Sequence, residues 1–184
     1  MKLNLNLKRI LINALIVVVF LIIYFLQANF FSWFTIAGIM PNLFVILVLI
    51  LGLFAGKIYG TIYGIVFGFL LDLFIGNTVG ITSAMLGIVG FIGGIFSKNF
   101  SKDSRLIIML MIMALTGVYE IGIYFFEIIF NGVGVELIAF LKILIVEVVY
   151  NGILSIILYP ILRIFGDYIE GELKMKKIIG IKYF

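Results

Sequence analysis

Apolar residues along this chain fall into six long blocks separated by short polar gaps. The blocks cover residues 10–28, 41–56, 58–75, 80–97, 106–130 and 138–163. A transmembrane helix needs about 20 consecutive, mostly apolar residues. The pattern therefore predicts an all-α membrane protein in which about six transmembrane helices form a compact bundle. We expect residues 1–165 to form this transmembrane domain and residues 166–184 to form a short tail.

The second and third blocks are interrupted only by Lys57, so the chain is expected to turn tightly at Gly56 and Lys57. Pro41 suits the first turn of the helix that precedes this turn. That second block has 16 residues and would extend about 24 Å, which is less than the hydrocarbon thickness of about 30 Å. The sequence leaves open whether it spans the bilayer or re-enters it.

Basic residues occupy alternate gaps between the blocks, which predicts an orientation. Twelve of the 13 Lys and Arg residues lie before the first block, at the tight turn, or after the fourth and sixth blocks: Lys2, Lys8, Arg9, Lys57, Lys98, Lys102, Arg105, Arg163, Lys174, Lys176, Lys177 and Lys182. The remaining gaps contain no basic residue. By the positive-inside rule, both termini and the tail are expected to be cytoplasmic.

Composition supports this class and excludes several functions. The chain of 184 residues is 65% hydrophobic and 12% charged, with a mean hydropathy of +1.35, so lipid is expected to cover most of its surface. Its net charge of +4 is spread over helix ends and does not indicate nucleic-acid binding. Because the chain has no cysteine or histidine, thiolate and imidazole chemistry is excluded, and no cofactor or metal is expected.

Glycines recur with a step of four through the middle of the chain. The series comprises Gly52, Gly56, Gly60, Gly64 and Gly68, and a shorter one comprises Gly90 and Gly94. Small residues at this spacing allow helix backbones to approach closely in a membrane. The stripes therefore predict helix packing within the bundle or, as the alternative, a docking surface for another membrane protein.

Ionisable and polar residues inside the predicted spans are the candidate functional side chains. They are Asp72, Glu120, Glu127, Lys142, Glu147 and Asn151. Charges are costly in hydrocarbon, so such residues usually face the bundle interior and often have a function. Counted along the helices, Asp72, Glu120 and Glu147 share the outer half of the membrane. We expect them to enclose a polar cavity or an interhelical contact, and a ligand, proton or partner role stays open.

Two further relations follow from spacing. Glu147, Asn151 and Ser155 follow one another by four residues and form a polar stripe on one helix face. Lys142 points away from this stripe, and its expected partner is Glu127 across the last hairpin, at a similar height. This spacing predicts an ion pair near the membrane surface. None of these residues forms a catalytic motif, because the acids are single and lie on separate spans.

The segment from Met40 to Gly80 resembles the MreD family of rod shape-determining membrane proteins. The likeness is carried by the Pro41-Asn42 pair, by the four-spaced glycine series and by the segment GFLLDLFIG at 68–76. On this resemblance, the family motif residues are Pro41, Asn42, Asp72, Gly76 and Gly80.

The resemblance implies a non-enzymatic component of the bacterial inner membrane that scaffolds or regulates the cell-elongation machinery during peptidoglycan synthesis. The implied partners are an MreC-like protein, the actin-like MreB, and the SEDS glycosyltransferase with its class B penicillin-binding protein. MreD-like proteins are also similar in fold to the S components of energy-coupling-factor transporters. The alternative function is therefore a substrate-binding subunit of a small-molecule transporter.

Overall fold

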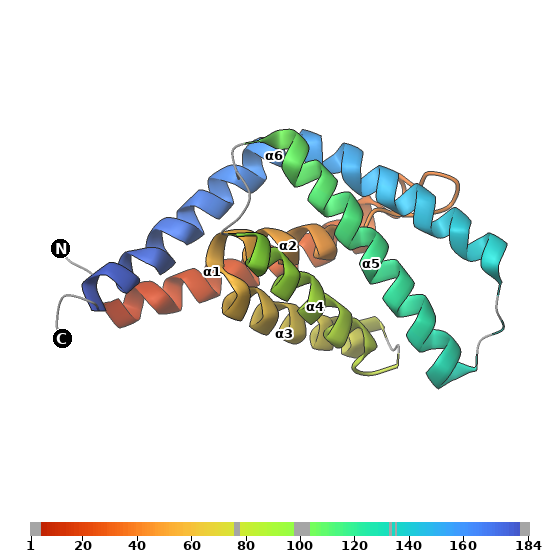
Figure 1. Ribbon diagram of the computed structural model, residues 1–184, viewed down its shortest axis with the longest axis horizontal. Coiled ribbons are helices and arrows are strands. Elements are labelled where there is room, and N and C mark those ends of the chain that lie inside the picture. The colour runs from red at the N-terminus through yellow and green to blue at the C-terminus, as the bar shows by residue number, and fades with distance from the viewer. Residues whose placement is uncertain (1–4, 76–77, 98–103, 133, 135, 181–184) are drawn as a thin grey trace.

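The computed structural model describes residues 5–75, 78–97, 104–132, 134 and 136–180, and these residues are mostly helical, with a loop at 31–42. The elements are α1 (Leu5–Phe25), the π-helical η1 (Leu26–Phe30), α2 (Leu43–Ala55), α3 (Lys57–Ile75), α4 (Ile81–Phe96), α5 (Arg105–Asn131) and α6 (Leu137–Gly180). Figure 1 shows their arrangement. Each of the six apolar blocks corresponds to one of the six α-helices in the described residues.

Four of these helices are long and apolar enough to cross a membrane. The qualifying segments are Ile10–Phe30, Lys57–Ile75, Arg105–Phe130 and Leu137–Glu172. In contrast, α2 has 13 residues and extends about 20 Å, and α4 has 16 residues and extends about 24 Å. Six α-helices are therefore present in the described part of the chain, as expected, but only four of them are long and apolar enough to count as candidate spans, and α4 as well as α2 is short.

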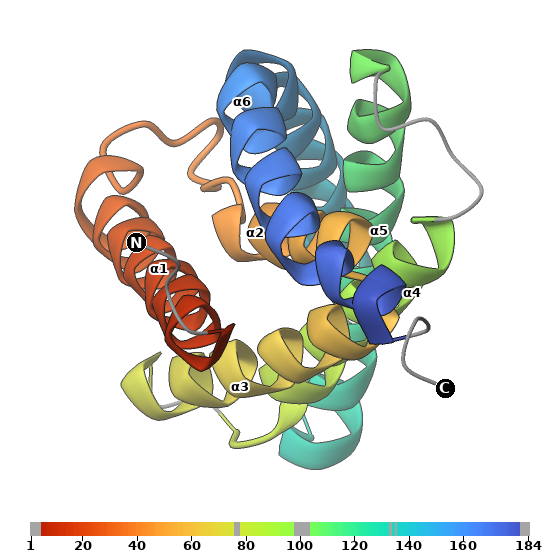
Figure 2. The same cartoon turned by 90° about the vertical axis from the view of Figure 1, so that its left-hand side faces the viewer.

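Helix α2 lies at the centre of the bundle. Figure 2 shows it surrounded by the other helices, and every residue from Leu43 to Phe54 is buried. A helix that is apolar on all sides is suited either to a protein core or to contact with lipid, and here α2 lies in the core. The core therefore forms around α2, where Phe20 of α1 stacks on Phe67 of α3 with ring centroids 4.3 Å apart.

The predicted turn between the second and third helices is present and consists of one residue. Gly56 separates α2 from α3 and adopts a φ of 95°, a backbone conformation that glycine tolerates best. The start of α2 differs from expectation, because Asn42 is the N-cap and its side chain accepts a hydrogen bond from the Val45 amide. Pro41 consequently precedes the cap and does not lie in the first helical turn.

Helix α6 is much longer than the predicted span. It continues through residue 180 without a break at residue 165, and it contains Pro160. Proline removes a helical hydrogen bond and bends a helix, and α6 changes direction along its length in Figure 1. The start of α1 and the end of α6 lie at the same end of the molecule, where Lys8 and Glu172 form an ion pair of 3.6 Å. We call this the terminal end and the opposite end the loop end.

Candidate functional site

The glycine stripes face other helices of the same chain. A Cβ atom on Gly60 would lie 2.6 Å from the Gly90 carbonyl oxygen, and one on Gly68 would lie 2.7 Å from the Ser83 amide nitrogen. A Cβ on Gly64 would collide with the backbone at Leu86. Because the obstructing atoms are backbone atoms, α3 and α4 can approach this closely only without these side chains.

Glycines also allow α2 to pack closely against α4, and the end of α4 to pack closely against the start of α3. A Cβ on Gly52 would collide with the Gly90 carbonyl, and one on Gly94 would collide with the backbone of Lys57. Gly56 differs, because a Cβ there would meet nothing within 4 Å. These glycines, apart from Gly56, are buried in the bundle, so the stripes do not form an exposed surface.

A polar network holds the start of α2 at the loop end. The Asn42 backbone amide donates to Asn151 Oδ1 at 2.8 Å, and Asn151 Nδ2 donates to Thr116 Oγ1 at 3.0 Å. Asn151 and Thr116 are fully buried. A buried amide side chain with both ends bonded fixes the relative position of the helices that it joins. Asn151 thus connects α2, α5 and α6.

Gln27 of η1 binds the same segment from the other side. Its Nε2 donates to the Pro41 carbonyl at 2.6 Å, and its Oε1 accepts from the Leu43 amide at 3.1 Å. The first backbone amides of a helix have no partner within that helix. Gln27 and Asn42 therefore satisfy two of these groups at the point where α2 enters the apolar core.

Glu120 and Glu147 meet between α5 and α6. Their carboxyl groups lie close enough to influence each other electrostatically, and the Asn42 side chain lies near Glu147. Glu147 is 7% exposed, and within the described residues its Oε1 is a buried oxygen without a hydrogen-bond partner. Tyr119 lies near Asn42 and near Thr82 of α4. The pair of acids thus adjoins the network at the start of α2.

Asp72 lies apart from this pair and caps α4. Its Oδ2 accepts hydrogen bonds from the Gly80 amide at 2.8 Å and from the Ser83 amide at 3.3 Å. A carboxylate at a helix N-terminus satisfies free amides and complements the helix dipole. Gly80 has a φ of 105° and is the N-cap residue. Gly76, the other glycine of the family motif, lies outside the described residues.

The stripe of Glu147, Asn151 and Ser155 is buried on the inner face of α6. The expected ion pair between Glu127 and Lys142 is not found: the described residues contain no ion pair between them, and Lys142 is exposed whereas Glu127 is half-buried. Lys142 follows the start of α6 by only five residues. A lysine so close to a helix end can extend into the aqueous interface without a partner.

A pocket of about 330 Å³ opens beside the network at the loop end. Its polar lining consists of uncharged side chains, which include Tyr24, Gln27, Asn42, Thr82 and Tyr119. Asp72, Glu120 and Glu147, for which we expected a polar cavity or an interhelical contact, do not line this pocket. Glu120 and Glu147 lie close together between two helices, and Asp72 caps α4. Within the described residues, no group of His, Cys, Asp and Glu could hold a metal ion.

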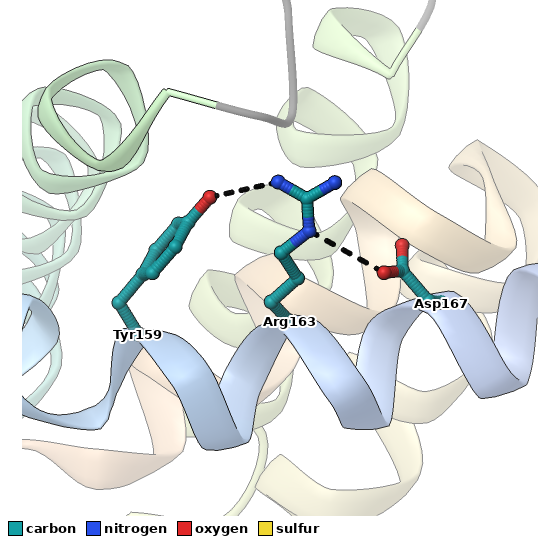
Figure 3. A network of polar contacts seen from close by, with 3 residues as sticks. All are labelled: Tyr159, Arg163 and Asp167. Atoms are coloured by element: carbon teal, nitrogen blue, oxygen red, sulfur yellow. Dashed lines mark hydrogen bonds and ion pairs between the residues drawn. The ribbon is translucent and has the colours of Figure 1, made fainter.

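A second polar cluster lies toward the terminal end, on successive turns of α6. Figure 3 shows Arg163 between Tyr159 and Asp167: its Nη1 donates to Tyr159 Oη at 3.1 Å, and its Nε is 3.4 Å from Asp167 Oδ2. Arg105, at the start of α5, lies over the Tyr159 ring with 5.2 Å between Cζ and the ring centroid. This cation–π contact joins α5 to α6.

Sequence reasoning missed the roles of Gln27 and Thr116. Gln27 is an amide near the end of an otherwise apolar block, and Thr116 lies four residues before Glu120 on the same helix face. Both signals are visible in the sequence. Their partners, however, lie 14 to 35 residues away, and helical spacing alone cannot identify such pairs.

Comparison with known proteins assigns a family. A family model described as rod shape-determining protein MreD matches residues 8–169, which is most of the chain. No curated protein and no solved structure matches the chain.

Proposed function

This chain belongs to the MreD family of rod shape-determining proteins, and from that premise we propose that it is a non-enzymatic scaffold and regulator of bacterial cell elongation. It resides in the inner membrane with both termini in the cytoplasm. Its role there is to guide peptidoglycan synthesis through contacts with other membrane proteins.

The family match over residues 8–169 is the observation that carries this proposal. The contacts of the polar residues support it. Asn151 and Asp72 form hydrogen bonds that position helices. A catalytic site would need a nucleophile, or a paired acid and base, that can reach a substrate. A helix bundle held in this way suits a scaffold, because the surface that it offers to its partners keeps one shape.

The proposed partners are an MreC-like protein, MreB, and the SEDS glycosyltransferase with its class B penicillin-binding protein. The position of the chain ends supports a cytoplasmic contact with MreB, because α1 begins and α6 ends at the same end of the molecule. The basic residues of both segments favour the cytoplasmic side for that end.

Depletion in the native bacterium tests the function. Removal of the protein is expected to convert rods into round cells, and re-expression of the wild-type chain is expected to restore rods. Cells that stay rod-shaped after complete depletion, without a second copy of the gene, would contradict the proposal. A Lys142→Gln chain serves as the matched control, because this exposed side chain makes no ion pair within the described residues, and it should restore rods as well as the wild type does.

The pocket at the loop end favours a second candidate function, a substrate-binding subunit with an arrangement like that of a transporter S component. Its lining of amides, hydroxyls and aromatic rings is typical of sites for small uncharged ligands. The test is a thermal shift of the purified protein with a panel of neutral metabolites. A ligand that raises the melting temperature of the wild type but not that of Thr82→Trp would support this function.

A further inference from the structure

The connection between α1 and α2 exposes aromatic side chains. We call residues 30–42, from the end of η1 to the cap of α2, the aromatic loop; it is orange in Figure 1 and lies toward the loop end. Trp33 is 86% exposed, and the rings of Phe30 and Phe34, each at least half exposed, have centroids 4.7 Å apart. The helices in the described part of the chain thus leave these three rings largely uncovered.

The aromatic loop lies in a long stretch of the chain that carries no charge. Residues 10–56 contain no Asp, Glu, Lys or Arg. A surface that binds another protein has a polar rim, whereas the belt of side chains at a membrane–water interface is rich in Trp and Tyr. An indole ring suits that boundary, because it combines an apolar body with one N–H donor. The composition therefore favours lipid as the cover of Trp33.

The backbone of the aromatic loop is hydrogen-bonded within the molecule. Ile36 and Ile39 exchange two backbone hydrogen bonds of 3.0 and 2.9 Å, and the Trp33 amide donates to the last residue of η1 at 3.1 Å. The Phe34 carbonyl accepts from the Tyr150 hydroxyl of α6 at 2.7 Å. A loop in water could bond to water instead, but lipid tails offer no partner to backbone groups. This internal pairing allows the segment to lie at the edge of the hydrocarbon region.

The tip of the aromatic loop is an apolar turn. Ala37 and Gly38 form the turn between Ile36 and Ile39, and their φ angles are 52° and 82°. Asn or Asp followed by Gly is the usual choice for a two-residue turn in which both φ angles are positive. Alanine takes the first of these positions here, and Ile36 beside it is 48% exposed. An apolar tip of this kind matches contact with lipid.

We propose that the aromatic loop inserts into the membrane–water interface of the leaflet at the loop end, with Trp33 at the level of the lipid headgroups. The loop continues the exposed apolar face of α1, on which Leu21 and Phe25 are 50% and 65% exposed, and the candidate span Ile10–Phe30 ends where the loop begins. Insertion anchors the end of α1 at the membrane surface and, through Tyr150, the adjoining part of α6. The proposal depends on the location in a membrane and not on the scaffold function.

The fluorescence of Trp33 tests the insertion directly, because Trp33 is the only tryptophan of the chain. The purified full-length protein is reconstituted into phosphatidylcholine vesicles whose acyl chains carry bromine either near the headgroup or near the methyl end. We expect the emission to lie at shorter wavelength than that of N-acetyltryptophanamide in buffer. Bromine near the headgroup should quench it more strongly than bromine near the methyl end, and acrylamide in the water should quench it less than it quenches the free compound.

A second reporter calibrates the depth. The double variant Trp33→Phe, Leu21→Trp moves the only tryptophan to an exposed position near the middle of the candidate span Ile10–Phe30, where bromine near the methyl end should quench more strongly. Quenching of the two reporters with the same depth profile would overturn the interfacial position. Quenching of Trp33 by acrylamide but not by bromine would place the loop in water and overturn the proposal. Protection from both quenchers would overturn it in favour of a protein cover, such as a second copy of the chain.

The variant Tyr150→Phe tests the link between the aromatic loop and α6. It removes the hydroxyl that binds the Phe34 carbonyl but keeps the ring. The freed carbonyl then needs water as a partner, so quenching of Trp33 by acrylamide should rise and quenching by bromine should fall. Tyr168→Phe is the matched control, because this tyrosine of α6 lies toward the terminal end and is 52% exposed, and it should behave as the wild type does. Unchanged quenching in Tyr150→Phe would overturn the link.

Discussion

Gly90→Ala is the most informative single substitution, because one methyl group would meet backbone on a neighbouring helix. The new Cβ would collide with the carbonyl group of Gly60 and lie 3.1 Å from the Thr61 amide nitrogen. These atoms belong to the helical backbone of α3, so they cannot rotate away as a side chain can. To relieve the overlap, α3 and α4 must move apart along their whole contact.

The expected change in stability combines two effects of opposite sign. Overpacking a well-packed interior costs about 1 to 3 kcal/mol, whereas replacing a helical glycine by alanine contributes up to about 1 kcal/mol of helix stability. Because the overlap is with backbone atoms, the cost should lie near the upper end of its range, and Gly90→Ala should lower the free energy of unfolding by about 2 kcal/mol.

Gly117→Ala is the matched control. Gly117 lies within α5, and the nearest atom to an added Cβ there is Val148 Cγ2 at 3.9 Å, an ordinary contact. This variant keeps the gain in helix propensity without the overlap, so it should be as stable as the wild type or more stable. The assay is equilibrium unfolding in mixed micelles with increasing SDS, followed by far-UV circular dichroism. If Gly90→Ala unfolds at the same SDS fraction as Gly117→Ala, the account of close packing between α3 and α4 is wrong.

Three other substitutions address the polar residues. Asn151→Leu removes the acceptor of the Asn42 amide and the donor to Thr116. In the same assay it should lower the free energy of unfolding by about 1 to 3 kcal/mol, and an unchanged unfolding midpoint would refute the bridging role. Asp72→Leu removes the cap of α4 and should cost about 1 to 2 kcal/mol, seen as faster hydrogen exchange in the first turn of that helix but not in α5. Lys142→Gln should change stability by less than about 0.5 kcal/mol, so a larger loss would reveal a partner for this lysine.

Local structure followed well from the sequence, because hydropathy and helix breakers act over short distances. The apolar blocks located the helices, and the interruption at Lys57 located the turn that Gly56 makes. The ends of the helices were harder to predict from the sequence. Asn42 is the cap of α2 because it bonds to the Val45 amide. Helix α6 runs past residue 165 although Gly166 and Gly171 disfavour a helix, and no proline follows Pro160.

Contacts between distant segments could not be derived in the same way. The depth estimate placed Glu120 and Glu147 at similar heights, but only the packing of α5 against α6 brings their side chains together. The same estimate grouped Asp72 with them, although this residue bonds to the start of α4. The position of a side chain depends on its height along the membrane normal and on the rotation of its helix about the helix axis. The depth estimate gives only the height.

The most direct test of the central claim is affinity purification of the tagged wild-type chain from native membranes in mild detergent, with quantitative mass spectrometry of the proteins that accompany it. A scaffold of the elongation machinery should enrich an MreC-like protein strongly over a tagged, unrelated membrane protein of similar abundance. Recovery of the folded chain without any component of that machinery, also after crosslinking in intact cells, would contradict the account.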